Sequence, residues 1–167
     1  MAEQKKERVA IVPGSFDPIT LGHLDILRRA AALYDRVYLA VMINREKRYM
    51  FTLEERHRIA SVAVRDIDRV EVISSDGMLW ELARDLGACA IVKGYRNEID
   101  LQYEQSMAEY NRERYPQAET VLLPSDDQLL NISSTVVRER LQTNESLVDL
   151  LPSDVIDEIM SIFNKRK

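Results

Sequence analysis

Short apolar runs alternate with helical patterns along the whole chain. Five runs rich in β-branched residues read as buried strands: 9–12, 37–43, 70–73, 88–92 and 120–123. Between and after them, apolar residues recur at helical spacing, which predicts helices over about 24–34, 52–64, 79–86 and 99–114, and others beginning near 134 and 153. Strands separated by helices form βαβ units. The pattern therefore predicts an α/β fold, a Rossmann-like, doubly wound, five-stranded parallel sheet with helices on both faces.

Particular residues indicate where some of the predicted helices begin or end. Thr52 and Glu55 have the spacing of a capping box and predict the start of a helix, whereas Gly87 predicts the end of one. No repeat or linker divides the chain, and 167 residues is the size of one domain. We therefore expect a single domain over residues 1–167, with the last helix, about 153–164, as part of it.

Composition narrows the possible functions. Hydrophobic residues make up 46% and charged residues 31% of the chain, as in soluble globular proteins. The net charge of −5 argues against binding duplex DNA through a general basic surface, so no nucleic-acid partner is expected. The five glycines match neither G-x-G-x-x-G nor the P-loop pattern.

The lone cysteine and the N-terminal residues exclude further classes. A single Cys89 rules out an internal disulfide and a multi-cysteine zinc site, and its apolar neighbours predict a buried, inert thiol. The first residues, MAEQKKER, lack the apolar core of a signal peptide, and no later run approaches membrane-spanning length. We expect a cytoplasmic protein with no membrane partner.

The segments after the strands hold the candidate chemistry, because ligands of such sheets bind beyond the carboxyl ends of the strands. The first strand is followed by a stiff loop, in which Gly22 allows close approach of a ligand and His23 stands at a helix start. A helix N-terminus suits a phosphate group. A Gly-His pair by itself is more often just a capped helix with a surface histidine. Lys47 follows the second strand and Lys93 the fourth, so both reach the same edge of the sheet.

Residues 13–23, P-G-S-F-D-P-I-T-L-G-H, resemble the signature of nucleotidyltransferases with a (H/T)-x-G-H motif. Downstream, Lys47, the block M-F-T-L-E-E-R at 50–56, K-G-Y-R at 93–96 and I-S-S-T at 132–135 follow in order. This set resembles the bacterial phosphopantetheine adenylyltransferase family over essentially the whole chain. The chain departs from the family pattern at Lys93, where arginine is usual, and lysine keeps the charge without the planar two-pronged fork.

The resemblance implies adenylyl transfer from ATP to 4′-phosphopantetheine, giving 3′-dephospho-coenzyme A and pyrophosphate. Two alternatives stay open. One is another nucleotidyltransferase of the superfamily, acting on nicotinamide mononucleotide or making a cytidylyl product. The other is a non-catalytic nucleotide-binding module, which would be expected to have lost His23 or Lys47.

The resemblance also assigns roles to residues. It implies catalytic roles for His23, Lys47 and Lys93, and acceptor binding by Ser15, Lys47, Lys93 and Leu79, with Met107 and Asn111 as weaker candidates. It further implies an ATP site made of Ser15, Phe16, His23, Gly94, Tyr95, Arg96, Glu104, Leu129, Leu130, Asn131, Ile132, Ser133, Ser134 and Thr135. No protein metal site is expected: Mg²⁺ would be carried mainly by ATP. Family members are typically homohexamers, which makes a homo-oligomer the expectation here.

Overall fold

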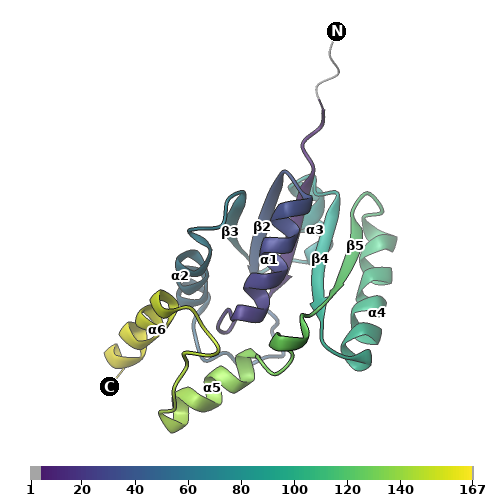
Figure 1. Cartoon of the computed structure of the whole chain (residues 1–167). Helices are drawn as coiled ribbons and strands as arrows, with labels where there is room; N and C mark the ends of the chain where they lie inside the picture. The colour runs from purple at the N-terminus through teal and green to yellow at the C-terminus, as the bar shows by residue number, and fades with distance from the viewer. Residues whose placement is uncertain (1–4, 167) are drawn as a thin grey trace.

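All five predicted strands lie side by side in one parallel sheet with the order β3-β2-β1-β4-β5 (Figure 1). In this computed structural model, which describes residues 5–166, the strands are β1 (Val9–Gly14), β2 (Arg36–Met42), β3 (Val70–Ser75), β4 (Ala90–Tyr95) and β5 (Glu119–Pro124). Ile11 of the central strand β1 pairs with Tyr38 on one side and Ile91 on the other. The predicted Rossmann-like fold is confirmed, and the strand order reverses between β1 and β4.

Helices cover both faces of the sheet. They are α1 (Leu21–Leu33), α2 (Leu53–Val64), α3 (Leu79–Asp85), α4 (Glu98–Arg114), α5 (Ser134–Thr143) and α6 (Ser153–Lys165), with a short 3₁₀ helix η1 (Asp127–Leu129). The larger apolar core joins the sheet to α1, α2, α5 and α6, and α6 packs against α2 through side chains such as Ile159. A smaller cluster lies on the opposite face under α3, around Ala83. This two-sided burial explains why the central strands are apolar throughout.

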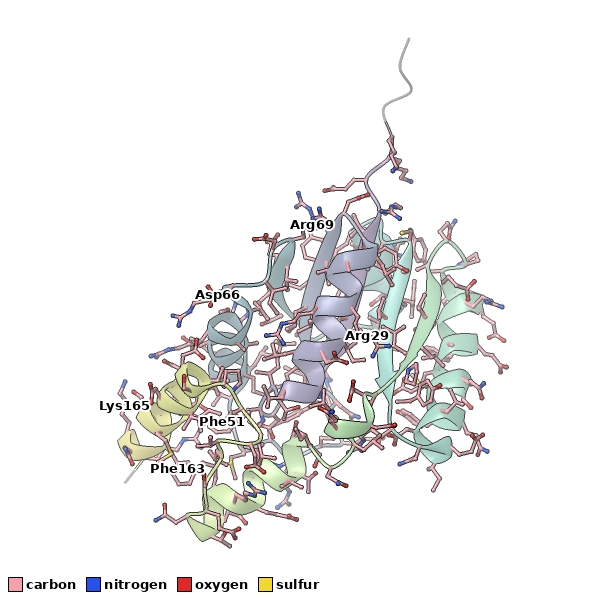
Figure 2. The ribbon with its side chains drawn as sticks, in the orientation of Figure 1. Arg29, Phe51, Asp66, Arg69, Phe163 and Lys165 are labelled. Carbon is pink, nitrogen blue, oxygen red and sulfur yellow. The ribbon has the colours of Figure 1, made fainter. Side chains whose placement is uncertain are left out.

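The predicted helix ends are present. The Thr52 hydroxyl accepts the Glu55 N–H at 3.1 Å, and the Glu55 carboxylate accepts the Thr52 N–H at 2.8 Å, which is a capping box at the start of α2. Gly87 follows α3 with a φ of +62°, a conformation that glycine adopts without strain. Phe51 lies inward of α6, whereas Lys165 points outward at its end (Figure 2).

The prediction for Cys89 was wrong. Its side chain is exposed, and its thiol donates to the Val9 carbonyl at 3.3 Å. The fourth strand runs over Ala90–Tyr95 and not over 88–92, and Cys89 lies in the bend just before it, with its side chain open to solvent.

No helix within residues 5–166 is long and apolar enough to cross a membrane. Residues 1–4, which carry half of the segment used to judge a targeting signal, and residue 167 lie outside the described residues.

Candidate active site

A cleft of about 620 Å³ opens at the carboxyl ends of β1 and β4, where the strand order reverses. The loop 15–20 after β1 forms one wall, and the loop after β2, with Lys47, another. The N-termini of α1 and α5 both face this space, through Gly22 and His23 and through residues 133–135. Two helix N-termini offer unpaired N–H groups and positive dipole ends, so the cleft suits a polyanion.

Most of the predicted site residues meet here. Those that line the cleft are Ser15, Phe16, His23, Lys47, Lys93, Gly94, Arg96, Glu104, Leu129, Ile132, Ser133, Ser134 and Thr135. Tyr95, Leu130 and Asn131 are not among its lining residues. Leu79 packs instead in the small cluster under α3 on the opposite face, and the α4 residues Met107 and Asn111 do not reach the cleft either.

The His23 imidazole is oriented by the backbone before it. The Thr20 N–H donates to His23 Nδ1 at 3.0 Å, so in the neutral ring the proton resides on Nε2. Desolvation, together with the nearby positive charge of Arg96, lowers the pKa of His23 to about 4. At neutral pH His23 is therefore an uncharged Nε2–H donor at the start of α1.

Close packing around this loop leaves no room for larger side chains. Phe16 has a φ of +46° and its ring lies edge-on to His23, with centroids 5.0 Å apart. A Cβ on Gly14 would come within 3.0 Å of the Phe16 ring. A Cβ on Gly94 would lie 2.9 Å from Ile26 Cγ1, so β4 approaches α1 as closely as glycine allows.

The start of α5 presents hydroxyl groups to the cleft. Ser133 Oγ accepts the Val136 N–H at 3.2 Å and keeps its own proton free to donate. The Ser134 hydroxyl donates to the Pro18 carbonyl at 2.7 Å, which ties α5 to the loop after β1. Arg138, one turn further along α5, donates to the Asp17 carbonyl at 2.8 Å and to Thr135 Oγ1 at 3.2 Å.

Charged groups in the cleft differ in whether they have partners. Lys93 Nζ lies 2.8 Å from Glu104 Oε2, and Arg96 Nε lies 3.2 Å from Asp100 Oδ2. Lys47 forms no ion pair with any residue in 5–166, and its side chain is exposed. Lys93 and Glu104, predicted to contact two different substrates, are thus bonded to each other.

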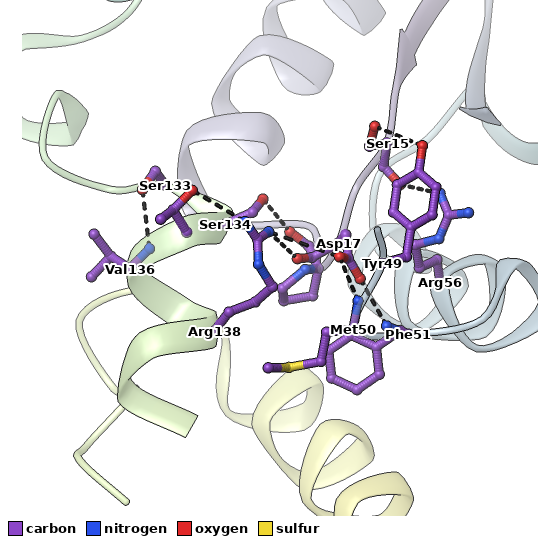
Figure 3. A network of polar contacts seen from close by, with 12 residues as sticks. Ser15, Asp17, Tyr49, Met50, Phe51, Arg56, Ser133, Ser134, Val136 and Arg138 are labelled. Atoms are coloured by element: carbon purple, nitrogen blue, oxygen red, sulfur yellow. Dashed lines mark hydrogen bonds and ion pairs between the residues drawn. The ribbon is translucent and has the colours of Figure 1, made fainter. Parts of the chain in front are cut away.

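Asp17, Tyr49 and Arg138 are among the residues of the cleft wall that sequence reasoning did not single out. Asp17 is only 3% exposed, and its carboxylate accepts two backbone N–H groups, those of Met50 and Phe51 (Figure 3). The signal for Asp17 was its place inside the 13–23 motif. For Arg138 it was the spacing of three residues from Thr135, which puts both on one helix face.

Among residues 5–166 no group of three or more histidine, cysteine, aspartate or glutamate side chains is placed to hold a metal ion.

The comparisons with known proteins agree with this geometry. The model of the cytidylyltransferase-like family matches residues 11–140. The chain, with its parallel sheet and cleft, therefore belongs to the cytidylyltransferase-like class.

Curated relatives narrow the class. A phosphopantetheine adenylyltransferase of Streptococcus gordonii is 42% identical over 92% of this chain and 94% of its own length. One of Clostridium beijerinckii is 40% identical over 94% of this chain and 99% of its own, and one of Chloroflexus aggregans 42% identical over 95% and 99%. The chain belongs to the phosphopantetheine adenylyltransferase family.

Proposed function

We propose that this protein transfers the adenylyl group of ATP to the phosphate of 4′-phosphopantetheine, giving 3′-dephospho-coenzyme A and pyrophosphate. The observation that carries this proposal is the neutral His23 donor at the start of α1, in a cleft that Lys47 also lines and that two helix N-termini face. The names and the nearly full-length similarity of the relatives support the choice of acceptor.

The reaction is an in-line displacement without a covalent enzyme intermediate. An oxygen of the acceptor phosphate forms a bond to the α-phosphorus of ATP as the bond from that phosphorus to the bridging oxygen breaks, and pyrophosphate leaves with its Mg²⁺. The acceptor is largely dianionic at neutral pH, because the second pKa of a phosphate monoester is about 6, so it needs no general base. The enzyme must align two anions and neutralise the growing charge.

Each task has a candidate residue. The Nε2–H of His23 would donate to the α-phosphate as negative charge develops on it. Lys47 and Lys93 would hold the acceptor phosphate, and in doing so Lys93 would exchange its Glu104 partner for the phosphate. Arg96 and the Ser133–Thr135 end of α5 would bind the β- and γ-phosphates.

Contacts to the nucleotide are proposed along the same walls. Phe16, Gly94 and Glu104 line the cleft beside the triphosphate site and would face ATP. Leu79 and Tyr95 lie outside the cleft lining, and their predicted roles with the pantetheine arm and with ATP stay predictions.

The direct test mixes the protein with ATP, Mg²⁺ and 4′-phosphopantetheine and measures pyrophosphate and dephospho-coenzyme A together. We expect both products in equal amounts. Parallel reactions replace the acceptor with nicotinamide mononucleotide, or ATP with CTP. Product with nicotinamide mononucleotide and none with phosphopantetheine would refute the proposed acceptor.

His23→Ala tests the transition-state role. Removal of one preorganised donor costs about 10²- to 10³-fold in turnover. We expect a kcat loss of that size with a much smaller change in ATP affinity, measured by calorimetry, because the helix amides and cations that bind the phosphates remain. An unchanged kcat would show that His23 does not stabilise the transition state.

A further inference from the structure

Asp17 joins two loops and the helix α5 beside the cleft. Its Oδ2 accepts the Met50 N–H at 2.9 Å and its Oδ1 accepts the Phe51 N–H at 3.0 Å, in the segment between β2 and α2 (Figure 3). Its own backbone carbonyl accepts the Arg138 guanidinium of α5. With both carboxylate oxygens occupied and only 3% of the residue exposed, Asp17 is placed to hold protein segments and not to contact a substrate.

The segment that Asp17 holds is the one that carries Lys47. We define the Lys47 loop as residues 43–52. Near its start, the Lys47 N–H donates to the Asn44 carbonyl at 3.0 Å and closes a turn. The Tyr49 hydroxyl accepts the Asn44 N–H at 2.7 Å and lies 3.4 Å from Ser15 Oγ. The turn with Lys47 is therefore held at its first residue, Asn44, by Tyr49, the residue directly before the two amides on Asp17.

The Tyr49 ring is held in place by Arg56. The guanidinium of Arg56 stacks on it, with Cζ 3.9 Å from the ring centroid. Arg56 also donates to the carbonyls of Ser15 at 2.7 Å and Met42 at 2.9 Å. The loop after β1, the end of β2 and the Lys47 loop are thus joined in one polar network.

The Lys47 side chain lacks such support. It is exposed and has no ion pair with any residue of the described chain, so only the backbone position of its turn defines where its ammonium group can reach. Transfer between two anions depends on alignment, and a misplacement of about 1 Å can cost about 100-fold in rate. The contacts that anchor the turn therefore affect how well Lys47 can reach the acceptor phosphate.

We propose that Asp17 is a positioning residue, whose carboxylate fixes the Lys47 loop so that Lys47 faces His23 and the α5 N-terminus across the cleft. This inference rests on the proposed function for the role of Lys47 toward the acceptor. The anchoring itself does not depend on the identity of the acceptor.

Asp17→Asn is the first test. The amide keeps one oxygen, but its NH₂ group opposes one of the two backbone donors, so one bond is lost. We expect faster hydrogen exchange at the Met50 and Phe51 amides, a rise in the KM for 4′-phosphopantetheine with a fall in kcat/KM of about 10- to 100-fold, and an ATP affinity within about threefold of wild type. Unchanged exchange at these two amides would overturn the anchoring role.

A double-mutant cycle with Lys47→Ala separates positioning from general destabilisation. If Asp17 acts through Lys47, Asp17→Asn lowers kcat/KM in the wild type but much less in the Lys47→Ala background. An equal fall in both backgrounds would overturn the proposal. If the wild-type protein does not use 4′-phosphopantetheine at all, the proposed function fails, while the exchange measurement still decides whether Asp17 anchors the loop.

Tyr49→Phe provides a second test of the proposal in case the Asp17→Asn variant does not fold. It removes the hydroxyl that holds Asn44 and leaves the ring on Arg56, and we expect a fall in kcat/KM of roughly fivefold that disappears in the Lys47→Ala background. Tyr34→Phe, at the opposite end of α1, is the matched control and should leave kcat/KM unchanged. A Tyr49→Phe variant as active as this control would also count against the proposal.

Discussion

His23 shows how one side chain acquires its chemistry from its immediate surroundings. Its Nδ1 accepts the Thr20 amide, and desolvation lowers its pKa to about 4, so the ring is a neutral donor at physiological pH. In the unfolded chain the pKa returns to about 6.5. The folded protein therefore binds fewer protons at this position than the unfolded chain does between these two values.

The stability of the folded protein should therefore depend on pH. The contribution of the neutral His23 is fully present above about pH 6.5 and is lost as the pH falls toward about 4. We expect the difference in free energy of unfolding between wild type and His23→Gln, measured in urea at several pH values, to shrink over that window. A difference independent of pH would contradict the lowered pKa.

Lys93 stands where the resemblance leads us to expect arginine, and its partner Glu104 is nearly buried. Arginine keeps the charge and offers more donors to the same carboxylate or to a phosphate. We expect Lys93→Arg to keep kcat/KM within about tenfold of wild type, whereas Lys93→Met, which removes the charge, loses at least about 100-fold. A Lys93→Arg variant as impaired as Lys93→Met would show that this cleft accommodates only lysine.

At the scale of elements, β4 and α1 pack closely against each other beside the cleft. A Cβ at Gly94 would lie 2.9 Å from Ile26 Cγ1, in the larger core. Overpacking of this kind costs about 1–3 kcal/mol. We expect Gly94→Ala to lower the free energy of unfolding by that amount in urea denaturation.

Gly77→Ala is the matched control for this contact. The added Cβ would meet nothing closer than 3.7 Å, so the free energy of unfolding of this variant should stay within about 0.5 kcal/mol of wild type. Equal stabilities for the two variants would show that α1 moves aside from β4 without cost.

At the scale of the whole molecule, the parallel sheet brings distant parts of the chain to one edge. Residues from 12 to 138 line the same cleft because the parallel strands end at that edge. Arg166, just after α6, adds a further tie: it donates to the Met50 carbonyl at 2.8 Å and forms an ion pair with Glu55. The end of the described chain thus contacts the same Lys47 loop that Asp17 holds from the inside. The homohexamer that the resemblance implies stays a prediction.

The sequence by itself determined the elements and their class. Apolar runs and helical periods predicted all five strands and the six α-helices, but not the short η1, because burial on both faces of a parallel sheet requires such runs. The 13–23 motif also predicted which residues lie near His23, because a loop between a strand and the next helix is made of residues close together in the sequence. Strand four was misplaced by a few residues, and with it Cys89, because the apolar run began in the turn before the strand.

The tertiary structure alone decided which of these residues have partners. The bonds from Asp17 to Met50 and Phe51, from Arg138 to the loop after β1, and from Lys93 to Glu104 join residues whose meeting depends on how the chain packs in three dimensions. The pKa of His23 likewise depends on desolvation and on the charge of Arg96, 73 positions along the chain. The local sequence pattern identified the chemical groups. Their partners and their burial depend on the folded sheet, which brings the strand ends together.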